Sequence, residues 1–255
     1  MNSAIIYKMR VKSLSLLSLI LILASFKCHA TEFHVVTEPW ESYSTEDGVG
    51  YYHDILNAVY KSSGDSLKFT YVPYARSLKM LEHDQVDIAL GVTATDTPEG
   101  AVTLDFPVEL DSAVIVFLKG SFPDWKGLSS LDGRNVIAKI EYNFGPLFGP
   151  TVKYSESATL NGMMQMLVKK RVDAVVDYEA DILAAIEEEK ITQPLEFKNG
   201  FNPVPIFFGF SKTENAKIAR KKFEEEIKKL IDSGALKAMY VKNFGASDNF
   251  PYKKQ

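Results

Sequence analysis

The sequence predicts an α/β protein made of two similar lobes, chiefly because it contains an internal repeat. Residues 77–90 and 163–176 each read as a helix, a polar turn, a Val-Asp pair and a short apolar run, at an offset of 86 residues. Short apolar runs that follow a helix in this way are typical of buried parallel strands. Two copies of one helix–strand unit favour two lobes over a single large sheet. A chance match over so short a stretch is the alternative.

The remaining elements alternate in the same way along the chain. Strands are expected at 34–37, 69–72, 85–91, 113–118, 135–138, 173–177 and 205–210. A helix is expected at 54–63, where Gly64 can take the left-handed conformation that ends helices. A second helix is expected around 160–168, where apolar residues follow the i, i+3, i+4, i+7 spacing and Ser157 suits an N-cap.

The last segment reads as a long amphipathic helix. Its apolar stripe runs from Ala219 to Ile231, pauses at Gly234 and resumes at 236–240, so one face must pack against a lobe. No Gly-, Ser- or Pro-rich linker separates the two copies of the repeat. Any connection between the lobes is therefore expected to be short and strand-like.

Residues 1–30 are expected to be a signal peptide for export. They carry four cations and no acid, and their apolar stretch, Leu14 to Phe26, is short for a membrane span of about 20 residues. Small side chains at Cys28 and Ala30 place the expected cut after Ala30, which makes the mature chain periplasmic and free of cysteine. An uncleaved membrane anchor is the alternative.

Composition and motif content exclude several classes of function. Without residues 1–30 the chain holds 25 cations against 33 acids and has no Lys/Arg-rich run, so nucleic acid and anionic membranes are poor partners. A mature chain without cysteine holds no disulfide, no thiolate nucleophile and no cysteine-ligated metal. No motif of the hydrolase, zinc-protease or nucleotide-binding type is present, and neither a metal nor a cofactor is expected.

Six short motifs occur in an order and spacing that match a known family. They lie at 50–54, 85–89, 105–107, 131–133, 171–177 and 232–245. Together they resemble the periplasmic solute-binding proteins of the polar amino-acid ABC-transporter family, and the resemblance spans about residues 33–245. The family implies two α/β lobes joined by two hinge strands, which close on a small ligand like a flytrap. In that plan one lobe holds 31–117 plus 211–255 and the other holds 118–210.

The ligand site is expected in the cleft, outside the carboxyl ends of the parallel strands. The polar and aromatic residues at those ends are Glu38, Trp40, Thr93, Thr95, Glu141, Tyr142, Asp177 and Tyr178. Such a mixture suits the orientation of a small polar molecule. Each type has a plainer alternative: edge packing for the aromatic rings, turn capping for the threonines and solvent exposure for the glutamates.

Asp177 is the strongest single candidate among these residues. By the resemblance, the Asp that closes the pattern at 172–177 grips the ligand's ammonium group. A carboxylate in a partly dehydrated cleft makes strong charge-assisted hydrogen bonds to such a group. The alternative is an N-cap for the helix that begins near Tyr178.

One departure from the family concerns the ligand's acidic end. Amino-acid binders of this type carry an Arg shortly after the threonine-rich strand end, but here the corresponding position falls on Glu99 or Gly100. Arg76, close to the candidate cleft aromatic Tyr74, is the expected substitute, with a surface ion pair as the alternative. If Arg76 does not face the ligand, the site is rich in carboxylates and an amine or polyamine-like cation becomes the expected ligand.

The expected function is capture of a small, polar, nitrogen-containing solute by a monomeric periplasmic protein. The expected partner is the membrane permease of an ABC-type importer. A ligand-sensing subunit for a membrane receptor would have the same fold and cleft, so the sequence leaves that function open. A periplasmic dehydratase-like enzyme is a weaker alternative, because no pair of acids has a spacing that singles it out for catalysis.

Overall fold

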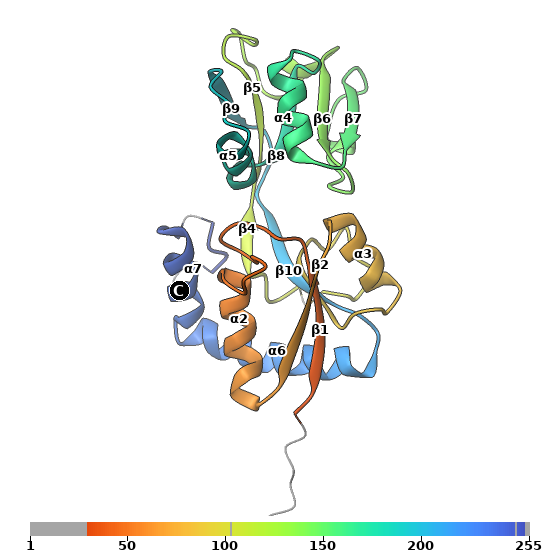
Figure 1. Ribbon diagram of the computed structural model, residues 1–255, viewed down its shortest axis with the longest axis vertical. Helices are drawn as coiled ribbons and strands as arrows, with labels where there is room; N and C mark the ends of the chain where they lie inside the picture. Colours follow the sequence, from red (N-terminus) through yellow and green to blue (C-terminus); the bar gives the residue numbers. More distant parts are fainter. Residues whose placement is uncertain (1–29, 103, 248, 253–255) are drawn as a thin grey trace, which may run out of the picture.

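The computed structural model describes residues 30–252 except 103 and 248. Two lobes lie one above the other, each built on its own five-stranded mixed sheet with helices packed against it (Figure 1). The expected signal peptide, residues 1–30, lies outside the described residues apart from Ala30. Within the described part, no helix is long and apolar enough to cross a membrane.

The first lobe has the strand order β2-β1-β3-β10-β4. Its strands are β1 (Glu32–Thr37), β2 (Ser66–Tyr71), β3 (Ile88–Val92), β4 (Glu109–Asp111) and β10 (Val204–Phe210). Its helices are α2 (Tyr51–Tyr60), the 3-10 turn η1 (Lys61–Ser63), α3 (Tyr74–Glu82), α6 (Glu214–Asp232) and α7 (Ala235–Phe244). β1 pairs in parallel with β2 and β3, whereas β10 runs antiparallel to β3 and β4.

The second lobe has the strand order β7-β6-β8-β5-β9. Its strands are β5 (Ala113–Leu118), β6 (Asn135–Lys139), β7 (Lys153–Ser157), β8 (Ala174–Tyr178) and β9 (Leu195–Asn199). Its helices are the 3-10 turns η2 (Leu128–Leu131) and η3 (Gly145–Leu147), α4 (Leu160–Val168) and α5 (Glu179–Glu188). β6 pairs in parallel with β7 and β8, whereas β5 runs antiparallel to β8 and β9.

The two sheets have the same arrangement of parallel and antiparallel strands, which confirms the two-lobed α/β fold expected from the repeat. The repeated Val-Asp pair also has the same structural role in each lobe. The carboxylate of Asp87 accepts a hydrogen bond from the N–H of His34 (2.9 Å), and that of Asp173 accepts one from the N–H of Asn135 (2.8 Å). Each repeated Asp therefore ties the first parallel strand of its lobe to the segment that leads into the repeat strand.

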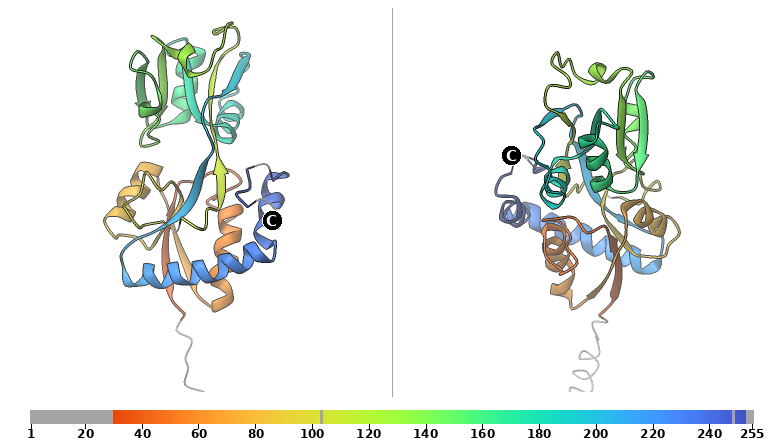
Figure 2. Two further views of the ribbon diagram at one scale, coloured as in Figure 1. Left: turned by 180° about the vertical axis from the view of Figure 1, so that it is seen from behind. Right: turned by 45° about the horizontal axis from the view of Figure 1, so that its top comes forward.

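Two chain crossings join the lobes (Figure 2). β4 leads through Ser112 into β5 of the second sheet, and β9 leads through 200–203 back into β10 of the first. The sheets therefore change at these points and not at 117/118 and 210/211, the lobe boundaries expected from the sequence. The reason is hydrogen bonding: β5 pairs with β8 and β9, while β10 pairs with β3 and β4.

Each sheet is buried on both faces. In the first lobe, Phe33 of β1 joins the core under α2, α6 and α7, whereas Val36 joins the core under α3. In the second lobe, Ile137 of β6 packs with α4 and α5, and the opposite face is covered by loop aromatics that include Phe122 and Phe144. Because both faces are covered, the strand ends between the lobes are the places where polar side chains gather.

The helix ends follow the sequence signals with one correction. Gly64 lies in the left-handed region (φ 77°) at the end of η1, as expected. α4 is capped by Thr159, whose hydroxyl accepts a hydrogen bond from the N–H of Gly162 (3.3 Å). The expected N-cap at Ser157 is therefore wrong, because Ser157 ends β7. The C-terminal helix is interrupted at Gly234 (φ 76°), where its apolar stripe pauses.

Candidate functional site

A cavity of about 1010 Å³ lies between the two lobes. Its walls come from the segments that follow β1 and β3 in the first lobe, from those that follow β6 and β8 in the second, and from β4 beside the crossing. This is the edge of the sheets where ligands of α/β proteins bind. The volume is at the upper end of the range of small-molecule sites, roughly 300–1,000 Å³.

The first-lobe wall depends on a close approach between Trp40 and Gly91. Gly91 of β3 has a φ of +67°, and a Cβ built on it would lie 2.6 Å from the indole ring of Trp40. Only glycine accepts both that backbone conformation and that contact. The Trp40 ring in turn packs against Tyr74, with 6.0 Å between ring centroids. Gly91 thus fixes the indole as part of the cavity wall.

The second-lobe wall is carried by an unusual turn after β6. Glu141 (φ 66°) and Asn143 (φ 52°) both lie in the left-handed region, on either side of Tyr142. Non-glycine residues rarely adopt this conformation, and such residues concentrate at functional sites. The turn directs the Tyr142 ring against Tyr74 of the opposite lobe (centroids 5.3 Å apart, interplanar angle 87°) and against Tyr178 (5.6 Å).

On this side the two lobes are joined by polar contacts. Lys139 Nζ lies 2.5 Å from Glu38 Oε1, and both side chains are largely buried, with 12% and 17% of their surface exposed. The other carboxylate oxygen of Glu38 accepts a hydrogen bond from the N–H of Tyr74 (2.9 Å). Asn143 donates a hydrogen bond across the gap to Asp96 (2.9 Å). We call this set, completed by Tyr142, the paired flank.

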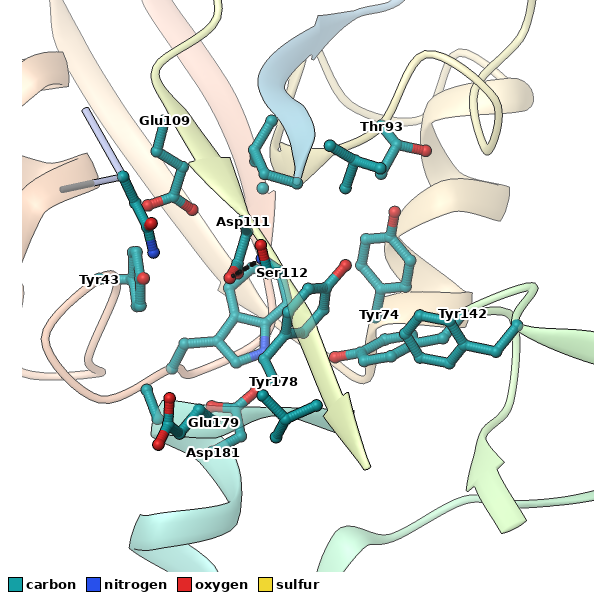
Figure 3. A pocket seen from close by; sticks show the side chains of 18 of the residues that line it. Tyr43, Tyr74, Thr93, Glu109, Asp111, Ser112, Tyr142, Tyr178, Glu179 and Asp181 are labelled. Carbon is teal, nitrogen blue, oxygen red and sulfur yellow. Dashed lines mark hydrogen bonds between the residues drawn. The ribbon is translucent and has the colours of Figure 1, made fainter. Parts of the chain in front are cut away.

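The opposite side of the cavity gathers carboxyl groups. Glu109 and Asp111 of β4 face Asp181 of α5, and Figure 3 shows them away from the rings of Tyr74 and Tyr142. We call these three carboxyl residues the acidic flank. Glu109 is 2% exposed, and its Oε1 accepts a hydrogen bond from Tyr52 (2.7 Å). Its Oε2 is buried and has no hydrogen-bond partner within the described residues.

The pKa values of the acidic flank are raised. Burial raises the pKa of Glu109 well above its usual range, and the nearby charge of Asp111 adds to the effect. Burial also raises the pKa of Asp111 to about 7 and that of Asp181 to about 6. Lys139 opposes the shift of Asp181 by favouring its charged form. Asp111 and Asp181 therefore titrate near neutral pH.

The cavity lining is acidic overall. Five carboxyl side chains line it, namely Asp96, Glu109, Asp111, Glu179 and Asp181, and no Lys or Arg occurs among the described lining residues. No group of three or more His, Cys, Asp or Glu side chains in the described part is close enough together to hold a metal ion. These carboxyl groups are thus spread along the cavity and have no cationic partner among the described lining residues.

Six of the ten residues expected from the sequence line the cavity. They are Trp40, Tyr74, Thr93, Thr95, Tyr142 and Tyr178. The two threonines also build the turn after β3, since their hydroxyls lie 2.9 Å apart and the Thr93 hydroxyl accepts a hydrogen bond from the N–H of Asp96. For them, the functional role and the turn-capping alternative are compatible.

The other four expected residues do not line the cavity. Arg76 is exposed on α3, and Glu141 lies in the strained turn beside Tyr142. Glu38 is held in the ion pair with Lys139. The substitute clamp expected at Arg76 is therefore absent from the described lining.

Asp177 is the most consequential of these four. It is fully buried (0% exposed) at the end of β8, behind the cavity wall. Its Oδ1 accepts a hydrogen bond from the N–H of Tyr178 (2.8 Å), and its Oδ2 has no partner within the described residues. The N-cap of α5 is Tyr178, so the helix-capping alternative for Asp177 does not hold. Burial and the charge of Asp181 raise the pKa of Asp177, while Lys139 acts against them.

The sequence reasoning missed the acidic flank and Lys139. A signal was present at 109–111, where two acids flank a leucine directly before an apolar strand. Acids at such a position are unexpected unless they serve a site, because burial of a carboxylate is costly. Asp181 had a weaker signal, since an acid in the first turn of a helix is common for reasons of the helix dipole alone.

A model of the bacterial extracellular solute-binding proteins, family 3, matches residues 33–246, which is most of the chain. The protein belongs to this family. A search of curated protein sequences finds no significant match. The cavity of this solute-binding protein lies between its two α/β lobes.

Many solved structures have a similar fold at low sequence identity. One, from work on glutathione import through GshT and the cystine ABC importer TcyBC of Streptococcus mutans, is 18% identical (TM-score 0.72), covering 88% of this chain and 98% of its own. An ancestral arginine-binding protein bound to arginine is 21% identical (TM-score 0.69), with 84% and 98% covered. A histidine-bound ABC substrate-binding protein from Streptococcus pneumoniae is 16% identical (TM-score 0.68), with 87% and 95% covered.

Proposed function

We propose that this solute-binding protein captures a small solute with a positively charged nitrogen and delivers it to an ABC-type importer. The observation that carries the proposal is the charge of the cavity: five carboxyl side chains line it, without a Lys or Arg among the described lining residues. A carboxylate removed from water needs a cation or a proton as partner. A cationic ligand supplies that partner when the cavity closes around it.

The missing arginine supports the same proposal. A bidentate Arg is the usual partner of a ligand carboxylate, because its fork matches the two carboxylate oxygens. Here the family position falls on Glu99 or Gly100, and Arg76 does not line the cavity. The structural neighbour described as bound to arginine carries a ligand with a cationic side chain, which is consistent with a cationic solute for this fold.

We further propose that the protein works outside the cytoplasm as a monomer, and that it binds its ligand without converting it. The expected signal peptide at 1–30 and the family's extracellular character support the location. The lobes are proposed to move about the crossings at Ser112 and 200–203, because backbone rotations there would change the angle between the sheets.

A thermal-shift screen of amino acids, amines, organic acids and short peptides, followed by calorimetry on the hits, tests the ligand proposal. Cationic compounds should raise the melting temperature, and anions of similar size should not. A ligand that lacks any cationic nitrogen would contradict the proposal. For the importer, a strain that lacks the protein should lose uptake of the labelled ligand. Unchanged uptake with intact binding would favour a sensor.

A further inference from the structure

We infer that the cavity takes an elongated organic cation with two positively charged nitrogens and no carboxylate, a diamine or polyamine, with one ammonium group bound by the acidic flank. This inference rests on the proposed function, because it assumes that the cavity binds a cationic solute. It adds the number of charges on the ligand, the absence of an acidic end, and the residues that bind one end.

The first step is the position of Glu109. Its side chain lines the cavity, is almost fully buried, and leaves Oε2 without a hydrogen-bond donor among the described residues. Tyr52 donates to Oε1 (2.7 Å), and the hydroxyl of Tyr43 also lowers the pKa of Glu109 by hydrogen bonding, but neither phenol supplies a positive charge. A buried carboxylate oxygen without a donor is rare, because its desolvation is not compensated. An ammonium group from the ligand supplies both the donor and the opposite charge.

The second step is the number of charges. The three acidic-flank carboxyls lie within electrostatic reach of one another, since Asp111 and Asp181 both act on Glu109. One ammonium group at the acidic flank would leave Asp96, which also lines the cavity, without a cationic partner, because its hydrogen bonds come from neutral side chains, those of Tyr74 and Asn143 among them. A single divalent metal ion does not fit either, because the described part holds no group of three acids at metal-binding distance. A chain with two separated cationic nitrogens can reach both the acidic flank and Asp96.

The third step is the length of the site. Beside the acidic flank the cavity is lined by the rings of Tyr178, Tyr142 and Tyr74 (Figure 3), and Tyr74 donates a hydrogen bond to Asp96 (3.1 Å). Tyr178 is within electrostatic reach of both acids, since the charges of Asp111 and Asp96 both raise the pKa of its hydroxyl. Aromatic faces accept methylene groups and attract cations at the same time. The second nitrogen is therefore placed at the aromatic end, near Asp96.

The fourth step is the absence of a carboxylate partner. No Lys or Arg lines the cavity in the described residues. The N-terminus of α5 faces the cavity and would otherwise attract an anion, but Glu179 and Asp181 occupy its first turn. A ligand carboxylate would thus find no cationic partner in the described lining, and at the N-terminus of α5 it would lie beside acidic side chains.

Calorimetry with three chain-matched probes tests the inference. Cadaverine has two cationic nitrogens, L-lysine has the same chain with a carboxylate added, and pentylamine has one nitrogen removed. We expect cadaverine to bind at least about tenfold more tightly than either of the others, since a fully desolvated charged pair accounts for roughly 30-fold or more in affinity. Putrescine and spermidine define the preferred length.

Substitutions test whether the acidic flank binds an ammonium group of the ligand. Glu109→Gln should weaken cadaverine binding about tenfold or more. The variant should then bind cadaverine and pentylamine with affinities within about threefold of each other. Glu187→Gln is the matched control, because Glu187 also lies on α5 but is exposed and does not line the cavity. It should change affinity by less than about threefold. Asp177→Asn tests the residue that the family resemblance implies for ammonium binding. We expect it to lose less affinity for cadaverine than Glu109→Gln does. Circular dichroism checks the fold, and Asp181→Asn replaces Glu109→Gln if that variant does not fold.

The outcomes are distinguishable. If L-lysine or pentylamine binds as tightly as cadaverine, the inference is overturned while the proposed function stands. If only neutral or anionic solutes bind, both are overturned. If cadaverine binds best but Glu109→Gln and Asp181→Asn bind as tightly as the parent, the acidic flank is not the ammonium site and the inference fails in that part.

Discussion

The two sides of the cavity use charge in opposite ways. On the paired flank, Lys139 from the second lobe forms an ion pair with Glu38 from the first, and the neutral amide of Asn143 donates a hydrogen bond to Asp96 across the gap. On the acidic flank, Glu109 and Asp111 face Asp181 and no described lining residue is a cation. One side therefore holds the lobes together with the protein's own groups, and the other is left incomplete.

The difference separates closure from recognition. Largely buried ion pairs are costly to break, because the remaining charge stays desolvated. The paired flank can thus bias the lobes towards one arrangement whether or not ligand is present. The acidic flank carries carboxyl groups with raised pKa values, and a cationic ligand can supply the partner that these groups lack. Affinity should depend on both sides, and specificity should depend on the acidic flank.

The largest effect beyond the Glu109 test is expected for Lys139→Met. This variant leaves Glu38 without its counter-ion, and a hydrogen bond to a charged group contributes about 1.5–3 kcal/mol, or roughly 10- to 100-fold in affinity. Calorimetry with the tightest-binding amine should show that loss, and small-angle scattering should show a more open ligand-free protein. Lys153→Met, an exposed change on neighbouring β7, is the control. Parent-like affinity and scattering would mean that the pair does not link closure to binding.

The next effect concerns pH and ligand affinity. The titratable groups that interact with the acidic flank include Tyr43, Tyr51, Tyr52 and Tyr178, together with Glu38, Asp177 and Lys139 near Asp181. Since Asp111 and Asp181 lose protons near pH 7 and 6, cation binding should strengthen roughly tenfold between pH 5.5 and 8. Calorimetry at four pH values measures it. Asp111→Asn should flatten the dependence, and a flat parent profile would show that these carboxyls do not contact the ligand.

A smaller effect concerns the stability of the ligand-free protein. Between the usual value of 3.8 and about 7, the folded chain holds a proton on Asp111 that the unfolded chain releases. Stability is therefore greatest below this window and falls as pH rises through it. Between pH 5 and 7 the loss is roughly 1–3 kcal/mol, or a few degrees in melting temperature. Differential scanning calorimetry at pH 5 and 8 tests the sign. Asp111→Asn should reduce the difference; a parent that melts higher at pH 8 would reverse the argument.

The smallest effect is expected at the exposed end of the paired flank. Asn143 donates to the Asp96 carboxylate at 2.9 Å, but the contact is open to solvent, where water competes for both groups and the hydrogen bond contributes only about 0.5–1.5 kcal/mol. Asn143→Ala should weaken binding by less than about threefold in calorimetry. Asn143→Gly separates the contact from the backbone, since the residue has a φ of 52°. A loss as large as that of Lys139→Met would show that the exposed contact also controls closure.

Much of the fold follows from local patterns. The repeat predicted two equivalent sheets. The repeated residues Asp87 and Asp173 have equivalent structural roles, since each accepts a backbone hydrogen bond from the first parallel strand of its lobe. The strand ends at Trp40, Thr93 and Tyr142 were found because parallel strands bring their carboxyl ends to one edge. Both lobe boundaries were expected too late in the chain, at the ends of β5 and β10. Each of these strands belongs instead to the lobe that follows the crossing before it. Apolar runs predict strands without naming their partners.

The sequence by itself determined the two-lobed class, the cleft and the absence of an arginine clamp, because these depend on periodicity and on residue identity. Only the tertiary structure decided which acids stay unpaired. Glu38 and Glu109 are both glutamates near a strand end, but Lys139 from the other lobe neutralises Glu38, whereas Glu109 is buried with one oxygen free. Burial and pairing arise from residues far apart in the chain, 101 positions in the case of Glu38 and Lys139, so no local pattern could assign them.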